Sequence, residues 1–192
     1  MPSRRMPRAT VVDMSRHRPL RAASIVIAVL LGAGALAGCG PSAPAPTPTP
    51  TGFASEAEAF AAAEATYRAY VDALNQVDLS DPSTFEEVYR WTTGDANAEA
   101  RESFSQMHAD GWTVSGRTAY DSLTVVDSAS MPLTMEVCLD VSDVDVVDAS
   151  GESVVPTTRL DRQALSAQLV ASTTATGLAI SSSNAIESDL CG

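Results

Sequence analysis

The apolar residues in the first part of the chain recur at the spacing of an α-helix. Residues 55–76 form the longest such segment, and Ser55 followed by Glu58 makes a capping box at its start. The apolar positions of this Ala-rich segment are Phe60, Tyr67, Val71 and Leu74. The pattern therefore predicts a long first helix with one buried face.

Two shorter helices are predicted after it. One begins at Asp81, which caps it, and Pro82 occupies the first helical position. The other covers residues 95–110 and ends before Gly111. The residues expected to face the core are Phe85, Val88 and Tyr89 in one helix and Ala100, Phe104 and Met107 in the other.

After Gly111 the hydrophobic period changes from 3.6 residues to two. In residues 133–141 the odd positions are apolar and the even ones mostly polar, which is typical of a half-buried strand. The apolar residues move to even positions after Ser142, so we expect a bulge or bend near Ser142 and Asp143, then a turn at 148–151. Further strands are expected at 117–128, at 160–172 and from Gly177 onward.

A different kind of segment precedes the first helix. Basic residues at 16–21 are followed by an apolar stretch of the length typical of a secretory signal. The alternative is a retained membrane helix, but the stretch is short for a membrane span and is interrupted by glycines. Leu36-Ala37-Gly38-Cys39 resembles the lipobox of bacterial lipoproteins. This resemblance implies a type II signal peptide over residues 1–38, acyl chains on the sulfur of Cys39, and a lipid anchor on the extracytoplasmic face of the cell membrane. A start at Met14 would give a more ordinary signal peptide than one at Met1.

The remaining chain divides into a tether and a folded domain. Residues 40–52 contain five prolines and no charge, so residues 39–52 are expected to form the lipidated cysteine and an extended spacer of about 40 Å. Residues 53–192 suit one compact domain. From Cys39 onward the chain has six Arg, no Lys and 23 acidic residues, a net charge of −17. Such a polyanion excludes nucleic-acid binding and electrostatic docking to anionic lipid as functions.

Helices followed by strands predict an α+β fold in which the helices cover one face of a curved antiparallel sheet of four to five strands. This order, together with the sequence EVCLDVSDVDVVDASGESV at 136–154 and a C-terminal cysteine, resembles the NTF2-like lipoproteins of high-GC Gram-positive bacteria. The resemblance covers residues 55–191 and implies an NTF2-like cone. The sequence GLAIS at 177–181 departs from it, because such domains often carry Trp after the Gly.

Cys138 and Cys191 are the only cysteines after Cys39. In an exported protein they are expected to form a disulfide that closes a loop of about 50 residues and contributes about 3–4 kcal/mol. Two free thiols are the alternative. Cys138 falls on the polar face of its strand, where the C-terminal segment can reach it.

Two sets of residues are candidates for metal binding or acid–base chemistry. The acidic residues Asp140, Asp143, Asp145, Asp148 and Glu152 lack the spacing of an EF-hand, so a solvated strand edge is favoured over a calcium site. His108 is the only histidine beyond Cys39, and no second ligand is spaced to join it. We therefore predict no metal and no cofactor, and favour a surface or half-buried helical position for His108 over a general base.

Six aromatic residues would meet around the interior of an NTF2-like cone, where they form either the core or the lining of a cavity. They are Tyr67, Tyr70, Tyr89, Trp91, Trp112 and Tyr120. The favoured function is a membrane-anchored envelope lipoprotein whose domain binds a partner protein or a small apolar ligand without catalysis. The alternative is a ketosteroid-isomerase-like enzyme using Tyr67, Tyr70, Asp72 and His108, and a weaker one is a scaffolding subunit of an envelope complex.

Overall fold

The computed structural model describes residues 52–192. The predictions for the signal peptide, the start at Met14, Cys39 and the tether up to residue 51 lie outside the described residues. Three helices come first along the chain, namely α1 (Glu56–Leu74), α2 (Phe85–Trp91) and α3 (Gly94–Ala109), and a 3₁₀ turn at Pro82–Thr84 precedes α2. The strands are β1 (Thr113–Ser115), β2 (Ala119–Asp127), β3 (Leu133–Asp140), β4 (Asp145–Val147), β5 (Arg162–Ala171) and β6 (Leu178–Ala185), and a 3₁₀ turn, η2, covers Asp189–Cys191.

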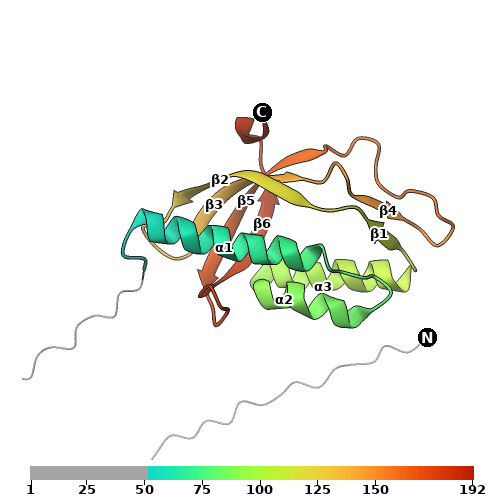
Figure 1. Ribbon diagram of the computed structural model, residues 1–192, viewed down its shortest axis with the longest axis horizontal. Coiled ribbons are helices and arrows are strands. Elements are labelled where there is room, and N and C mark those ends of the chain that lie inside the picture. The colour runs from blue at the N-terminus through green and yellow to red at the C-terminus, as the bar shows by residue number, and fades with distance from the viewer. Residues whose placement is uncertain (1–51) are drawn as a thin grey trace, which may run out of the picture. The chain divides into compact units, whose positions relative to one another are not determined.

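The strands form a four-stranded antiparallel sheet of order β2-β3-β5-β6 and a separate two-stranded ribbon of β1 and β4. Helix α1 lies across one face of the sheet, and α2 and α3 follow it on the same side (Figure 1). The predicted fold class, α+β with N-terminal helices packed on an antiparallel sheet, is confirmed. No helix among residues 52–192 has both the length and the apolar character needed to cross a membrane.

Local sequence explains where the helices begin. The hydroxyl of Ser55 accepts a hydrogen bond from the backbone N–H of Glu58 at 3.2 Å, and the Glu58 carboxylate accepts one from Ala54 N–H at 2.8 Å. The first bond is the one that the predicted capping box requires, while the reciprocal bond goes to the residue before the N-cap. Before α2, the Asp81 carboxylate accepts a hydrogen bond from the N–H of Ser83, with Pro82 in the first position of the turn.

The main core lies between α1 and the sheet. Helix α1 places Ala59, Ala63, Tyr67 and Val71 against it, and the odd-numbered residues of β3 from Leu133 to Val137 are fully buried opposite. The expected strand alternation of residues 133–141 is thus confirmed over β3. One prediction for α1 was wrong: Phe60 was expected in the buried stripe but is 39% exposed. Ala59 takes the buried position in place of Phe60, whereas Tyr67 and Val71 are buried as predicted and Leu74 is half-buried.

A second, smaller core joins α2 and α3. It contains Leu79, Phe85 and Tyr89, with Phe104, Met107 and Trp112 packed against it. The predicted buried residues of α2 are confirmed, since Phe85, Val88 and Tyr89 are all buried. In α3 the predicted stripe contacts this core but its residues are only half-buried.

The ribbon of β1 and β4 corrects one expectation. Asp145 was expected on a solvated edge that discourages strand pairing, but it pairs with Ser115 of β1. Its carboxylate accepts hydrogen bonds from Ser153 Oγ at 2.6 Å and Val146 N–H at 2.9 Å. The three residues of β1 are too few to show a hydrophobic period, so the partner strand was not predicted. The chain does bend after Asp140, and the turn at 148–151 is present.

Asn75, at the C-terminal end of α1, ties the helix to the start of β2. Its side-chain amide donates to the carbonyl of Thr118 at 2.9 Å, and its carbonyl oxygen accepts from the N–H of Thr118 at 2.8 Å. The amide therefore satisfies both backbone groups of Thr118, as a neighbouring strand would.

We expect Asn75→Ala to lower the free energy of unfolding by about 1–2 kcal/mol, because both backbone groups of a half-buried residue lose their partner. The adjacent residue offers a control: Gln76 is exposed and donates only to the Asp72 carbonyl of its own helix. Gln76→Ala should change stability by less than about 0.5 kcal/mol. Urea denaturation measures both, and equal effects of the two substitutions would contradict this account.

Candidate functional site

Three tyrosines fill the space between α1 and the sheet where a cone cavity would lie. Tyr67 is 1% exposed, and its ring centre lies 5.1 Å from that of Tyr120 in an edge-to-face arrangement and 5.8 Å from that of Tyr70. Burial raises the pKa of all three hydroxyls, and for Tyr67 the neighbouring tyrosines add to the effect. These groups are therefore packing residues and protonated hydroxyls at neutral pH.

The other aromatic residues of the predicted cavity lie elsewhere. Tyr89 and Trp112 belong to the second core, where the guanidinium of Arg101 stacks 3.9 Å from the ring centre of Tyr89. Trp91 lines a separate hollow with Arg90 and residues 172–175. The six aromatic residues thus occupy three places in the fold, and the structure does not arrange them around one cavity. Of the two alternatives considered for these residues, core or cavity lining, the core alternative fits Tyr67 and Tyr89, which are both buried.

The four residues considered for an enzyme are not brought together. Asp72 is exposed on α1, whereas Tyr67 and Tyr70 face the tyrosine cluster. The Nδ1–H of His108 on α3 donates to the backbone carbonyl of Leu79 at 2.6 Å, and its ring contacts the edge of Phe85 in the second core. His108 therefore fixes the loop before α2. Among residues 52–192 it has no carboxylate partner within ion-pair distance.

The carboxylates at the end of β3 and in the loop after it accept hydrogen bonds within their own turns. Hydrogen bonds from the side chain and backbone of Ser142 lower the pKa of Asp140, with a smaller contribution from Arg162. Asp148 accepts bonds from Ser150 and from Glu152 N–H, which lower its pKa in the same way. In the described part of the chain no group of three or more metal-ligating side chains comes together. These carboxylates therefore hold loop geometry.

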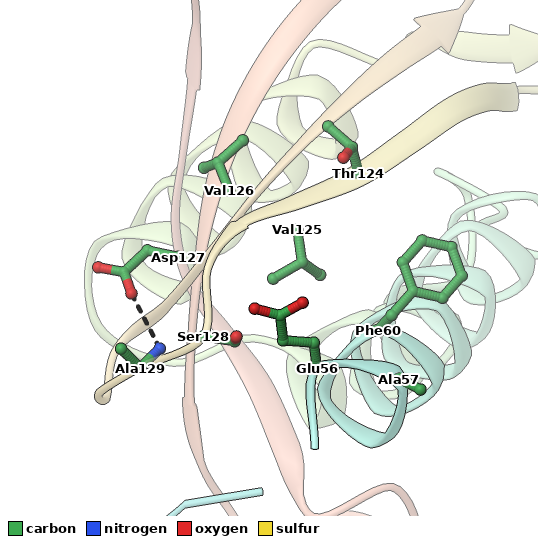
Figure 2. Close-up of a pocket in the computed structure, with 9 residues that line it drawn as sticks. All are labelled: Glu56, Ala57, Phe60, Thr124, Val125, Val126, Asp127, Ser128 and Ala129. Atoms are coloured by element: carbon green, nitrogen blue, oxygen red, sulfur yellow. Dashed lines mark hydrogen bonds between the residues drawn. The ribbon is translucent and has the colours of Figure 1, made fainter.

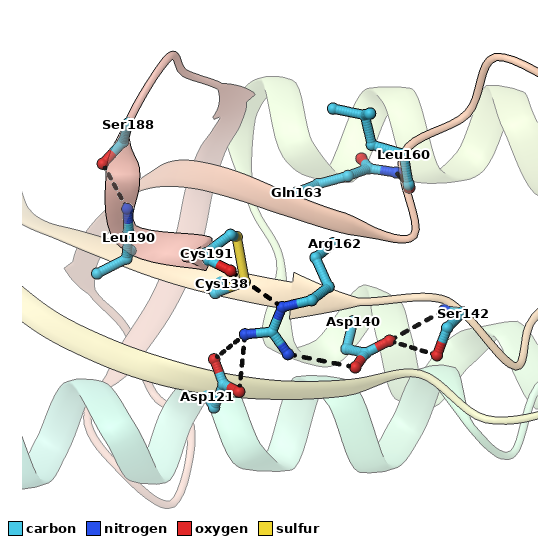
Figure 3. The surroundings of a disulfide bond; sticks show 10 residues. All are labelled: Asp121, Cys138, Asp140, Ser142, Leu160, Arg162, Gln163, Ser188, Leu190 and Cys191. Carbon is cyan, nitrogen blue, oxygen red and sulfur yellow. Dashed lines mark hydrogen bonds and ion pairs between the residues drawn. A yellow bond between two sulfur atoms is a disulfide. The ribbon is translucent and has the colours of Figure 1, made fainter.

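The outer face of the sheet, away from α1, carries the disulfide. Cys138 of β3 is fully buried beneath η2 and bonds to Cys191, with the two Cα atoms 5.2 Å apart (Figure 3). The predicted pairing is present. Beside it Arg162 of β5 forms a two-pronged ion pair with Asp121 at 2.9 and 3.0 Å, reaches Asp140 at 3.5 Å and donates to the Cys191 carbonyl at 3.3 Å. One guanidinium thus ties β2, β3 and the C-terminus to β5.

Two open grooves lie where α1 meets β2. The one at the beginning of α1, here named the N-terminal groove, has a volume of about 500 Å³ (Figure 2). It is lined by Glu56, Ala57, Phe60 and residues 124–129. The one at the end of α1, the C-terminal groove, has a volume of about 680 Å³ and is lined by Glu64, Arg68, Val71, Asp72, Asn75, residues 117–122 and Asp143.

The C-terminal groove contains charged residues of both signs beside apolar ones. Glu64 pairs with Arg68 at 2.6 Å within α1, and Asp121 is taken up by Arg162 on the outer face. Tyr120 lies in this groove, and burial is the largest cause of its raised pKa, with Glu64 and Asp72 acting in the same direction against Arg68. The arrangement places the neutral hydroxyl of Tyr120 among charges of both signs, with the carboxylates of Asp72 and Asp143 in the same groove.

Sequence reasoning missed both grooves. One joins residues 56–60 to 124–129, and the other joins residues 64–75 to 117–122 and Asp143, so no local motif marks them. The one available signal was Phe60, a large apolar residue beside acidic ones, and the helical pattern assigned it to the core.

No family model and no curated protein matches the chain. Solved structures similar to it include a proposed aromatic ring hydroxylase from Novosphingobium aromaticivorans, with 15% identity, a TM-score of 0.47 and coverage of 68% of this chain and 90% of that one. Aln2 from a Streptomyces species has 15% identity, a TM-score of 0.41 and coverage of 67% and 89%. The soluble domain of TrwG of the Bartonella grahamii type IV secretion machinery has 13% identity, a TM-score of 0.33 and coverage of 65% and 92%. Likeness at this level does not distinguish an enzyme from a binding domain.

The tyrosines give a pH prediction. All four in the chain have raised pKa values in the fold, chiefly through burial. Their contribution to stability is therefore complete below the unfolded value of about 10 and is lost as the pH rises above it. Absorbance titration at about 295 nm should show tyrosinate forming at higher pH in the native protein than in the protein unfolded in urea. Native tyrosines that titrate together near the unfolded value without unfolding would contradict the packed cluster.

Proposed function

We propose that this protein is a lipid-anchored component of the cell envelope whose acidic domain binds a cationic segment of a partner protein and performs no catalysis. The observation that carries the proposal is the disposition of charge. Of the six Arg in residues 52–192, Arg68, Arg90 and Arg162 form ion pairs with carboxylates of the same domain. Arg101 stacks on Tyr89, and Arg159 donates to the carbonyl of Val141. The positive charge is thus largely engaged internally, and most of the 23 acidic groups are left for a partner.

The packed interior favours a protein partner over a small apolar ligand. The side chains between α1 and the sheet, among them Tyr67, Met135 and Leu169, are at most 1% exposed. A ligand inside the cone would have to displace them, and packed cores resist such rearrangement. The same packing disfavours the isomerase-like alternative, because Tyr67 and Tyr70 are packed under α1 while His108 is bonded to Leu79 in the second core.

The anchor in this proposal is Cys39, supported by the order of basic residues, apolar stretch, small residues and cysteine in residues 16–39. Acyl chains give membrane affinity that does not depend on charge, at about 0.8 kcal/mol per buried methylene. This suits a polyanion that an anionic lipid surface repels. The extracytoplasmic side also agrees with a disulfide between Cys138 and Cys191, since such bonds persist in oxidising compartments.

The anchor is tested by Cys39→Ser. We expect the variant to remain unprocessed and to incorporate no palmitate analogue, because a serine oxygen does not replace the thiol that takes the lipid. Cys138→Ala with Cys191→Ala is the matched control, which should still be processed and labelled. Metabolic labelling and intact-mass measurement report both properties, and wild-type processing of Cys39→Ser would refute the anchor.

The binding function is tested by zero-length carbodiimide cross-linking in intact cells, which joins carboxylates to amines in direct contact. We expect a discrete adduct with one Lys-bearing protein, and its yield should fall as salt is raised, because ionic contacts are screened. Cells expressing a variant with Glu→Gln and Asp→Asn substitutions at Asp72, Glu86, Glu99 and Asp143 should give less adduct. A salt-insensitive result, or the absence of any adduct with the native protein, would count against a cationic partner.

A further inference from the structure

One edge of the sheet is covered and the other is open. At β6, Thr92 forms a parallel bridge to Ile180, and the N–H of Thr93 donates to the Ile180 carbonyl at 2.8 Å. At the opposite edge, β2 pairs only with β3 within residues 52–192. The outward N–H and C=O groups of β2 therefore form a row of unsatisfied hydrogen-bonding groups, which is the usual template for adding a strand.

The N-terminal groove provides an apolar floor beside this edge. Four large apolar side chains are exposed among the described residues, namely Phe60, Val126, Met131 and Leu160. Phe60 and Val126, which are 39% and 53% exposed, line this one groove together. In Figure 2 the side chain of Val125 points into the space between β2 and α1, toward the carboxylate of Glu56. Phe60 and Val125 lie on the α1 side of this strand edge, and Val126 projects from its other side (Figure 2).

The charge around this floor has one sign. Glu56 and Asp127 line the groove, and no Arg does. Neither carboxylate forms an ion pair within residues 52–192, and Asp127 accepts only the N–H of Ala129 at 3.0 Å. A segment that enters the groove would therefore lie between two carboxylates that the domain itself does not neutralise.

We propose that the N-terminal groove binds an extended segment of a partner protein, which adds to β2 as a further strand. Its apolar side chains would lie over Phe60 and Val126, and its Lys or Arg side chains beside Glu56 and Asp127. The proposal rests on the proposed function and names the surface through which the cationic partner is held. Affinity would come from main-chain hydrogen bonds and specificity from the alternation of side chains.

Two other occupants fit less well. A second copy would bring another acidic edge against Glu56 and Asp127, and like charges facing each other across strands are destabilising. The chain's own segment at 40–52 has no basic residue, and its five prolines lack the N–H that strand addition requires.

The test uses the full-length protein in detergent and a blocked ten-residue peptide in which Val alternates with Lys. Two derivatives carry N-methyl groups on the Val residues or on the Lys residues. Because successive N–H groups of a strand point to opposite sides, one derivative loses the groups that face β2 and the other loses those that face solvent. We expect the derivative that loses the N–H groups facing β2 to bind at least about tenfold more weakly than the parent peptide. The derivative that loses the solvent-facing groups should bind within about twofold of the parent.

Substitutions locate the site. Val126→Lys should weaken binding of the parent peptide about tenfold, since it removes apolar contact and adds a repelling charge. Leu160→Lys is the matched control, because Leu160 is 69% exposed and lies outside the groove, and it should bind as the native protein does. Glu56→Gln with Asp127→Asn should weaken binding and reduce its salt dependence, whereas Glu102→Gln, at an exposed position of α3 outside the groove, should do neither. Circular dichroism melting verifies that each variant is folded.

The outcomes separate this inference from the proposed function. One outcome is that the peptide binds in a salt-dependent way, both N-methyl derivatives bind equally and Val126→Lys has no effect. This outcome would contradict binding at the N-terminal groove but would still agree with a cationic partner. If the parent peptide does not bind, the groove is also wrong, and the carbodiimide adduct in cells decides the proposed function by itself. If the adduct is absent while the peptide binds at the groove with the expected pattern, the surface stands and the proposed partner in the envelope does not.

Discussion

The packing of one face of α1 against the sheet is the constraint on which the rest of the structure depends. Ala59 and Ala63 have no exposed surface and share one core with residues of β3, β5 and β6. Two turns after Ala59 along the helix, Tyr67 is buried in the same core. Asn75 then holds the end of the helix against Thr118. Together these contacts bury one face of the sheet and fix α1 alongside β2, so the shape of the surface at that edge follows from the core.

The same packing moves the functional chemistry to the surface. With Tyr67 and its neighbours in the interior, the titratable groups available to solvent are mostly carboxylates, with a few arginines and His108. Several carboxylates are engaged locally, as Asp140 and Asp148 are by serines of their own turns. Arg162 is used to join β2, β3 and β5 beside the disulfide. What remains is a strongly negative surface with little free positive charge, which favours recognition of a basic partner over acid–base catalysis.

Hydrophobic periodicity predicted most of this architecture. The helix start at Ser55 and the alternation in β3 depend on residues close in sequence, so both can be predicted without knowledge of the tertiary contacts. The pairing of Cys138 with Cys191 followed from there being only two candidates. Phe60 was misassigned because helical periodicity does not distinguish the neighbouring Ala59, which takes the buried position, from a larger apolar residue beside it. The β1–β4 ribbon and both grooves arise from segments far apart in the sequence, so they depend on tertiary contacts that no single segment shows.

An unpaired strand edge favours aggregation of any protein that is concentrated on a membrane. The negative charge of this domain opposes such aggregation. Copies anchored through Cys39 as proposed would meet in two dimensions, where unpaired edges associate readily. A net charge of −17 on each chain from Cys39 onward opposes that encounter. At physiological ionic strength the screening length is about 8 Å, so at closer range Glu56 and Asp127 repel another acidic edge beside the groove itself. In the proposed complex the same two carboxylates would attract the basic strand, so one set of charges would both oppose self-pairing and favour the partner.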